Sequence, residues 1–345
     1  MIRTILISVL LASAAICLRA QDCACRNWRP DISGPGFEQL TIRQKPDYSG
    51  YSFTTVVRRM ANCQAAGRGV LYVHGFNDYF FQKEMADSFA AHGIDFYAID
   101  LRRYGRSYRK GERQFDVRNI DEYYGDIDSA LAVMNAGGIT DVTLMGHSTG
   151  GLITASYMAR KPSPLVKRLI LNSPFLDWNL GKMEKWVWAV DLLGAVAPRV
   201  KISQGDSEAY SASLLRDRHG EWDYNTEWKL RHSPDVTAGW VRAIDLAQNY
   251  LHKHPYCIHV PILLMYSAQS YQGNEWSAEA SRSDAVLDVA DIKYYGMRLS
   301  HDVHPVKVNG GLHDLMLSAP RVRKALYPVI FRWLGAPECQ GAADK

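Results

Sequence analysis

The sequence has little net charge and lacks the features of a non-globular chain. Its 345 residues include 40 Lys and Arg against 36 Asp and Glu, and the formal charge of +4 is too small to indicate nucleic acid as a partner. There are no internal repeats or low-complexity tracts, and no stretch beyond the N-terminal region is apolar enough to cross a membrane. Hydrophobic residues make up 47% and charged residues 22%, which is typical of a folded domain. These features exclude a mostly disordered chain, a collagen-like chain and a coiled coil.

The N-terminal region has the pattern of a secretory signal peptide. A basic start at Arg3 precedes an apolar run over residues 4–17, which is shorter than the roughly 20 residues that span a bilayer. We expect cleavage within a few residues of Ala20; the alternative is an uncleaved anchor. Loss of residues 1–20 removes Arg3, Arg19 and no acid, so the charge would fall to +2. The pattern predicts a secreted or periplasmic protein.

Five cysteines would remain after cleavage, in a compartment where disulfides persist. An odd count leaves at least one thiol unpaired, and the spacing does not determine the pairing. One of the first two could tie down the new N-terminus. The five are Cys23, Cys25, Cys63, Cys257 and Cys339.

Short apolar runs alternate with segments of helical period along most of the chain. This alternation is typical of βαβ units around a mostly parallel sheet with helices on both faces. The predicted strands are 51–60, 69–74, 94–101, 141–146, 166–172, 262–267 and 303–308. The predicted helices are 80–91, 120–136, 150–160, 284–299 and 320–334.

About ninety residues between the predicted strands at 166–172 and 262–267 carry no strand signal. Six of the nine tryptophans lie in this region, and two of its segments have helical periodicity. We interpret it as an inserted helical cap over one end of the sheet. Because tryptophan combines a large apolar area with one donor, the cap indicates an apolar or aromatic binding slot. Its tryptophans are Trp178, Trp186, Trp188, Trp222, Trp228 and Trp240.

A candidate nucleophile follows the predicted strand at 141–146. The chain reads Gly-His-Ser-Thr-Gly over residues 146–150 and continues as a predicted helix. A strand, a G-x-S-x-G turn and a helix form the nucleophile elbow, in which glycines relieve crowding on both sides of a strained serine. Ser148 would therefore project from the sheet edge at a helix N-terminus.

Two backbone amides are candidates for stabilising an oxyanion. One belongs to Thr149, the residue after the serine, and the other to Phe76, in the loop after the strand that ends in His74-Gly75. His74 itself is interpreted as a structural, hydrogen-bonded residue.

The candidate base is His313, which follows the last predicted strand. Loops after parallel strands meet at one sheet edge, so this position can reach Ser148. His301 and His304 precede or begin the strand and would lie at its other end, and two such histidines alone make a poor metal site. We therefore expect no metal and no cofactor.

The candidate acid is Asp284. An acid is expected after the strand at 262–267, and the first Asp or Glu that follows this strand is Glu275. We prefer Asp284 to both Glu275 and Asp288, because Asp284 precedes a helical run and could face the histidine from a loop, whereas Asp288 would lie within that helix.

These motifs together resemble the α/β-hydrolase superfamily, in the serine aminopeptidase-like branch that includes monoacylglycerol lipases and lysophospholipases. The resemblance spans roughly residues 51–335, and it implies Asp284 as the acid and the inserted helical cap. It rests on HGF (74–76), DLRRYGRS (100–107), GHSTGG (146–151), SDAVLDV (283–289) and GGLHDLMLS (310–318).

Two departures from the family pattern lie near the expected cleft. Arg103 and Tyr104 stand where the family has Gly and His, and about fifteen residues separate the strand from the acid. The first departure lies in a basic cluster opposed only by Glu112, interpreted either as a solvated loop or as a site that attracts an anionic head group. The cluster comprises Arg102, Arg103, Arg106, Arg109, Lys110 and Arg113.

We expect a serine hydrolase that cleaves carboxylic esters with an apolar acyl or aromatic part through Ser148, His313 and Asp284, with Phe76 and Thr149 as the oxyanion hole. One alternative is an aminopeptidase-like amide hydrolase, for which Glu184, Glu221 and Glu227 of the cap would hold the substrate amine. Another is a non-catalytic ligand-binding protein. The expected organisation is a signal peptide (1–20), an N-terminal segment (21–50), a hydrolase core (51–175 and 256–338) and a cap (176–255).

Overall fold

The computed structural model describes residues 28–63, 66–204 and 207–339; the predicted signal peptide, Cys23 and Cys25 lie outside these ranges. A nine-stranded sheet forms the centre, in the order β1-β2-β3-β5-β4-β6-β7-β10-β11. The six strands from β5 to β11 are parallel, whereas β1, β2 and β3 extend the sheet antiparallel at one edge. The predicted mostly parallel α/β fold is confirmed.

The strands follow the apolar runs of the sequence. The inner parallel strands β5 and β10 are buried at every residue, as expected for strands covered on both faces. The strands are β1 (Arg29–Pro30), β2 (Phe37–Arg43), β3 (Phe53–Arg59), β4 (Arg68–Val73), β5 (Asp95–Asp100), β6 (Asp141–His147), β7 (Val166–Asn172), β10 (Ile262–Ser267) and β11 (Val303–Val308).

The sequence pattern missed β2, which pairs with β3 along its whole length. Only Phe37 and Leu40 of this strand are buried, and their spacing of three breaks the alternation by which a half-buried strand is recognised.

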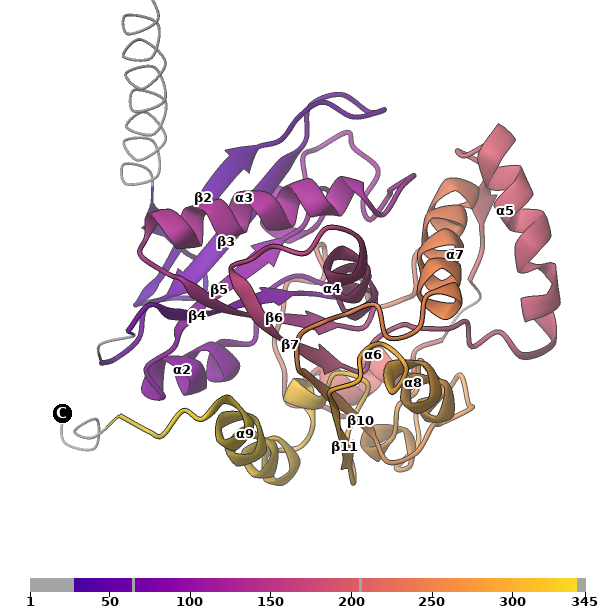
Figure 1. Cartoon of the computed structure of the whole chain (residues 1–345). Coiled ribbons are helices and arrows are strands. Elements are labelled where there is room, and N and C mark those ends of the chain that lie inside the picture. The colour runs from indigo at the N-terminus through magenta and orange to yellow at the C-terminus, as the bar shows by residue number, and fades with distance from the viewer. Residues whose placement is uncertain (1–27, 64–65, 205–206, 340–345) are drawn as a thin grey trace, which may run out of the picture.

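Helices cover both faces of the sheet (Figure 1). α3 (Glu122–Ala136), α4 (Thr149–Arg160) and α8 (Val289–Gly296) bury apolar residues in one half of the core, together with part of the cap. α2 (Lys83–Ala91) and α9 (Pro320–Leu334) bury theirs in the other half. No helix within the described ranges has both the length and the apolar character to cross a membrane.

The region between β7 and β10 contains the predicted helical segments. α5 and α7 pack against each other and stand side by side at the right of Figure 1. Its elements are the 3₁₀ segment η2 (Gly181–Trp186), α5 (Val187–Val196), α6 (Ala209–Leu214) and α7 (Ala238–Lys253), with the short pair β8 (Lys201–Ile202) and β9 (Val236–Thr237). From here on, the name cap is used for the whole region between β7 and β10, residues 173–261, which is wider than the predicted 176–255.

The helix predicted at 284–299 begins later than expected, at Val289. Oδ1 of Asp284 accepts the amides of Val286 and Leu287, and this local turn competes with helical hydrogen bonding. Asp288 caps the helix instead, since its side chain accepts the amide of Ala290.

Candidate active site

Ser148 occupies a strained turn between β6 and α4. Its φ of +52° lies in the region that L residues seldom adopt, as the nucleophile elbow requires. A Cβ at Gly146 would lie 2.5 Å from the carbonyl oxygen of Gly150, and one at Gly150 would lie 2.3 Å from that of Val73. Both flanking glycines are therefore required by close backbone approach.

Backbone hydrogen bonds hold this turn against the next strand. The Ser148 amide donates to the carbonyl of Asn172 at 3.0 Å, and the Ser148 carbonyl accepts the amide of Phe175 at 2.9 Å. Such pairing on both sides of the serine lets the fold maintain its strained conformation.

His313 and Asp284 form a buried hydrogen-bonded pair. His313 Nδ1 lies 2.9 Å from Asp284 Oδ2, and the two residues are 2% and 0% exposed. Because a carboxylate only accepts, Nδ1 is the donor of this bond, and in the neutral imidazole the lone pair lies on Nε2. Nε2 has no hydrogen-bond partner among the described residues, Ser148 included, and His313 lines the same cavity as Ser148.

The late position of Asp284 results from a loop that leaves the sheet and returns. The Asp284 amide donates to the Gln269 carbonyl at 2.9 Å, and the Asp284 carbonyl accepts the amide of Tyr271 at 2.7 Å. Residues 272–283 therefore form a loop that leaves the sheet, and the chain returns at Asp284 to the residues just after β10. Glu275 is exposed and Asp288 caps α8, so neither of these acids meets His313.

Phe76 and Thr149 both lie in the cavity wall with Ser148. Thr149 is the first residue of α4, so its amide has no intrahelical acceptor. A Cβ at Gly75 would lie 3.0 Å from the Ser148 Cβ, which places the loop before Phe76 directly against the nucleophile.

His74 has the structural role expected from the sequence. Its Nε2 accepts the amide of Leu101 at 3.1 Å, so its Nδ1 is the protonated nitrogen and donates to the Gly75 carbonyl at 2.8 Å. Burial lowers the pKa of His74, so the residue stays neutral while it ties the β4 loop to β5.

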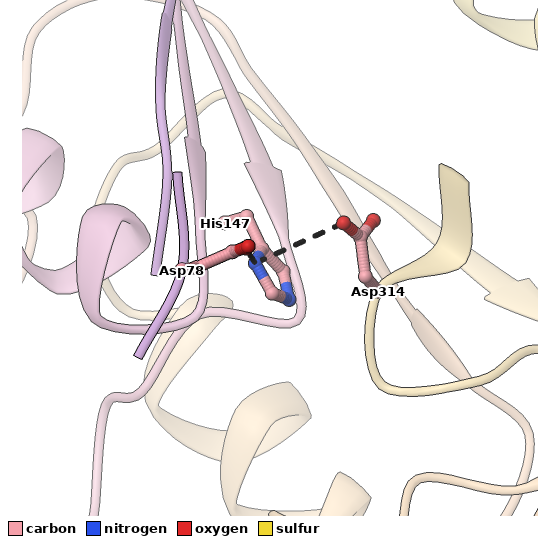
Figure 2. A group of neighbouring side chains, drawn as sticks. All are labelled: Asp78, His147 and Asp314. Atoms are coloured by element: carbon pink, nitrogen blue, oxygen red, sulfur yellow. Dashed lines mark ion pairs between the residues drawn. The ribbon is translucent and has the colours of Figure 1, made fainter. Parts of the chain in front are cut away.

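A buried polar cluster that the sequence analysis did not find lies behind Ser148. His147 Nδ1 is 3.7 Å from Asp78 Oδ2 and 4.0 Å from Asp314 Oδ2 (Figure 2). Lys229 of the cap donates to Asp78 Oδ1 at 3.0 Å, and Gln82 donates to Asp314 Oδ2 at 3.1 Å. The only sequence signals were the positions of these residues next to HGF, Ser148 and His313.

Three ligand-type atoms of Asp78, His147 and Asp314 lie within 4.8 Å of one another, a spacing that could hold a metal ion. The hydrogen-bond donors that surround these atoms make the site a poor one for a metal ion. Lys229 already supplies a positive charge to Asp78, while Gln82 and Asn172 donate to Asp314. An ion here would meet an ammonium and amide hydrogens.

The cavity in front of Ser148 has a volume of about 360 Å³ and two chemically different walls. The apolar wall is formed by Phe76, Phe175, Trp178, Leu180, Trp240, Val286 and Leu287. The polar wall includes Gln204, Ser207, Ser211, Tyr224, Tyr271, Gln272 and Asn274. Among the described lining residues the charged side chains are Lys229 and Arg231, and none is acidic.

Neither interpretation of the basic cluster fits its central arginines. Arg102 pairs with Asp126, Arg103 with Asp47, and Arg106 with Asp31 and Asp100. All three arginines are buried, and no member of the cluster lines the described wall of the cavity. These arginines therefore form buried structural ion pairs, and the N-terminal segment supplies two of the carboxylates, Asp31 and Asp47, from outside the recognised motifs.

The sheet order, the elbow at Ser148 and the buried His-Asp pair define an α/β hydrolase. The model of the family described as serine aminopeptidase, S33, matches residues 64–304, and the chain belongs to this family.

Its relatives include lipases. The chain is 24% identical over 290 residues to a monoacylglycerol lipase of Mycolicibacterium smegmatis, covering 83% of this chain and 95% of that protein. It is 26% identical over 141 residues to phospholipase YtpA of Bacillus subtilis, covering 39% of this chain and 51% of that protein. The crystal structure of a soluble variant of Saccharomyces cerevisiae monoglyceride lipase shares the fold, with a TM-score of 0.63 at 15% identity and coverage of 86% and 96%.

Proposed function

We propose that the protein hydrolyses carboxylic esters with an apolar acyl chain, using Ser148 as nucleophile, His313 as base and Asp284 as the acid that orients it. The observation that carries the proposal is the His313–Asp284 hydrogen bond, which engages Nδ1 and makes Nε2 the proton-accepting nitrogen of the neutral imidazole, in the cavity that contains Ser148. The similarity of the chain to a monoacylglycerol lipase, over most of both proteins, supports an ester substrate.

In the proposed reaction each group has a defined role. His313 Nε2 accepts the Ser148 hydroxyl proton as Oγ bonds to the ester carbonyl carbon, and the Asp284 carboxylate stabilises the imidazolium. The amides of Phe76 and Thr149 stabilise the oxyanion. Collapse breaks the ester bond, and the alcohol leaves with the proton from His313. Water activated by His313 then releases the acid and frees Ser148.

The cavity lining favours an ester over a peptide with a free N-terminus. A substrate ammonium would face Lys229 and Arg231, with no acid among the described lining residues. Glu221 instead binds Arg323, and Glu227 is exposed; the Glu184 side chain lies outside the described residues. The apolar wall offers Trp178 and Trp240 to an acyl chain, as the tryptophan content of the cap predicts.

A fluorophosphonate probe tests the nucleophile directly. We expect the probe to label the wild-type protein and to leave Ser148→Ala unlabelled, with Ser211→Ala, another cavity serine, labelled as a control. Wild-type labelling with undiminished labelling of Ser148→Ala would contradict the assignment. Absence of both labelling and turnover on a broad ester panel would favour a non-catalytic binding protein.

A substrate series separates the two hydrolase alternatives. We expect kcat/KM to rise with acyl length for p-nitrophenyl esters, because each added methylene that becomes buried contributes about 0.8 kcal/mol. Aminoacyl p-nitroanilides should react far more slowly, and a preference for them would establish the amide hydrolase instead.

We further propose that the protein is exported and cleaved near Ala20. The disulfide between Cys63 and Cys339 supports an oxidising compartment. Mass spectrometry of the mature N-terminus after expression in a secretion-competent host tests the proposal, and a mature chain that retains residues 1–20 would contradict it.

A further inference from the structure

Lys229 brings a positive charge from the cap into the interior of the site. It is only 5% exposed, and it is the one lysine that is buried in the described part of the chain. Its Nζ donates to Asp78 Oδ1 at 3.0 Å, and the rings of Phe81, Tyr210 and Tyr224 lie 5.6–5.9 Å away. Since a buried ammonium is costly without a counter-charge, Asp78 determines where Lys229 lies.

The second oxygen of Asp78 faces His147, the residue directly before Ser148. Asp78 Oδ2 has no hydrogen-bond partner, and neither ring nitrogen of His147 has one among the described residues. His147 is 2% exposed, and its ring centroid lies 4.9 Å from that of His313. Lys229, Asp78, His147 and His313 therefore form a continuous row from the cap to the proposed base.

Tyr210 gives the cap a second contact with the same row. Its hydroxyl accepts the amide of Asp314, the residue after His313, at 3.2 Å. Its ring meets the His313 ring edge-on at a centroid distance of 5.5 Å. The cap thus acts on the sequence neighbours of both Ser148 and His313. Lys229 reaches His147 through Asp78, and Tyr210 binds Asp314 directly.

We propose that Lys229 is a positioning residue through which the docked cap holds Asp78 beside His147 and sets the charge that surrounds the imidazoles of His147 and His313. This inference rests on the function proposed above. The carboxylates of Asp78 and Asp314 flank His147, and the ammonium of Lys229 offsets one of their two charges.

The charge balance supports this role. Burial alone would raise the pKa of Asp78, but the charge of the adjacent Lys229 and the smaller contributions of His147 and His74 together outweigh burial and bring that pKa to about 2. Without the ammonium, an imidazole beside the two carboxylates would bind a proton at a higher pH. The titratable groups that face this row are Tyr72 and His74 from β4 and its end, Asp100 from β5, Tyr79 from the β4 loop, Tyr210 and Tyr224 from the cap, and Asp284 and Asp314 from the loops after β10 and β11.

The test is a double-mutant cycle of Lys229→Met and Asp78→Asn, read as the pH dependence of kcat/KM on a p-nitrophenyl ester. Lys229→Met removes a positive charge, so we expect the midpoint of the acidic limb of the kcat/KM profile to move to a pH about one unit higher. Asp78→Asn removes a negative charge, so its acid limb should move down. The double variant removes both charges and should return toward the wild-type midpoint, with activity at least about tenfold above the product of the single effects.

Opposite shifts distinguish a charge effect from loss of packing, which would lower activity without moving the two limbs apart. Lys253→Met removes an exposed cap lysine and should leave the profile unchanged. Identical midpoints in all four proteins of the cycle would overturn the proposal. If Lys229→Met does not fold, the downward shift in Asp78→Asn supplies the test, and its absence contradicts the proposal.

Failure of the proposed function gives a different result. A wild-type protein that neither hydrolyses esters nor reacts with fluorophosphonate would contradict the proposed function alone. NMR titration of the histidine imidazoles in the same four proteins needs no substrate. It would show the opposite shifts if Lys229 sets the charge around His147, and unshifted imidazoles would contradict that role.

Discussion

The two carboxylate oxygens of Asp284 have separate partners. Oδ2 accepts the His313 Nδ1 proton, while Oδ1 accepts the amides of Val286 and Leu287. The second set holds the carboxylate rigidly, so its orientation relative to the imidazole is determined by the backbone. The same side chain therefore both ends the loop after β10 and orients the proposed base.

Replacement of Asp284 by Asn separates these two functions. An amide keeps the size of the side chain but no longer selects the tautomer with Nδ1 protonated, so we expect kcat to fall by about 10³–10⁴-fold with a much smaller change in KM. Steady-state kinetics on one ester measures this split. Glu275→Gln, at an exposed acid, should match the wild type, and a comparable loss in that variant would show that Asp284 has no special role.

Some residues of the site can be predicted from local sequence patterns, and others cannot. Ser148 and His313 belong to motifs whose strand context is visible locally, and the structure brings both to one cavity. Lys229 and Asp78 meet only because the cap folds back over the β4 loop, and neither residue lies in a pattern that predicts this contact. Charge pairs of that kind depend on three-dimensional proximity, which periodicity does not contain.

At the scale of elements, the N-terminal strands contribute charges to the core as well as hydrogen bonds to its edge. Asp31, just after β1, binds Arg106 through both carboxylate oxygens, at 2.6 and 2.8 Å. The sequence alone could not identify this pair, because Arg106 lies in a loop whose basic residues look solvated. The parallel strands were predicted from their continuous apolar runs, whereas β2 was missed because its buried residues do not alternate.

The pair of Asp31 and Arg106 makes stability depend on pH. Burial would raise the pKa of Asp31, but the hydrogen bonds and charge of Arg106, with further hydrogen bonds from Ser33, lower it below its value in the unfolded chain. This stabilisation is therefore complete above about pH 4 and is lost as pH falls toward the lowered pKa.

We expect Asp31→Asn to lower the free energy of unfolding by about 1.5–3 kcal/mol at pH 7. The difference from the wild type should shrink as pH is lowered below about 4. Urea denaturation across this range is the measurement. Asp87→Asn, which removes a more exposed partner of Arg59, serves as the control and should cost much less. A difference that grows on acidification would contradict the assigned ion pair.

At the scale of the whole molecule, the disulfide between Cys63 and Cys339 joins the loop before β4 to the segment after α9. The Cys339 amide also donates to the Ala91 carbonyl at 2.9 Å, so this end of the chain lies against the end of α2. Cys257 is half-buried and has no disulfide partner among the described residues. The odd cysteine count predicted an unpaired thiol, but only the fold shows which residues come together.

Replacing both Cys63 and Cys339 by serine should lower the free energy of unfolding by about 2–5 kcal/mol, because the unfolded chain then gains conformational freedom. Denaturant unfolding with and without a reductant provides the measurement. A reductant should bring the wild type to the level of the double variant and leave the double variant unchanged. Cys257→Ser should behave like the wild type, and sensitivity of the double variant to reductant would contradict this disulfide as the stabilising bond.

The same disulfide turns residues 63–339 into a covalent ring that contains the entire cap, Ser148, Asp284 and His313. A single proteolytic cut within the cap would open the ring without releasing a fragment, so the nicked protein would stay one covalently linked molecule until the disulfide is reduced. β1, β2 and β3 lie outside the ring, joined to it by one peptide connection. A cut between β3 and Cys63 would therefore leave these three strands without a covalent link, within the described residues, to the rest of the protein.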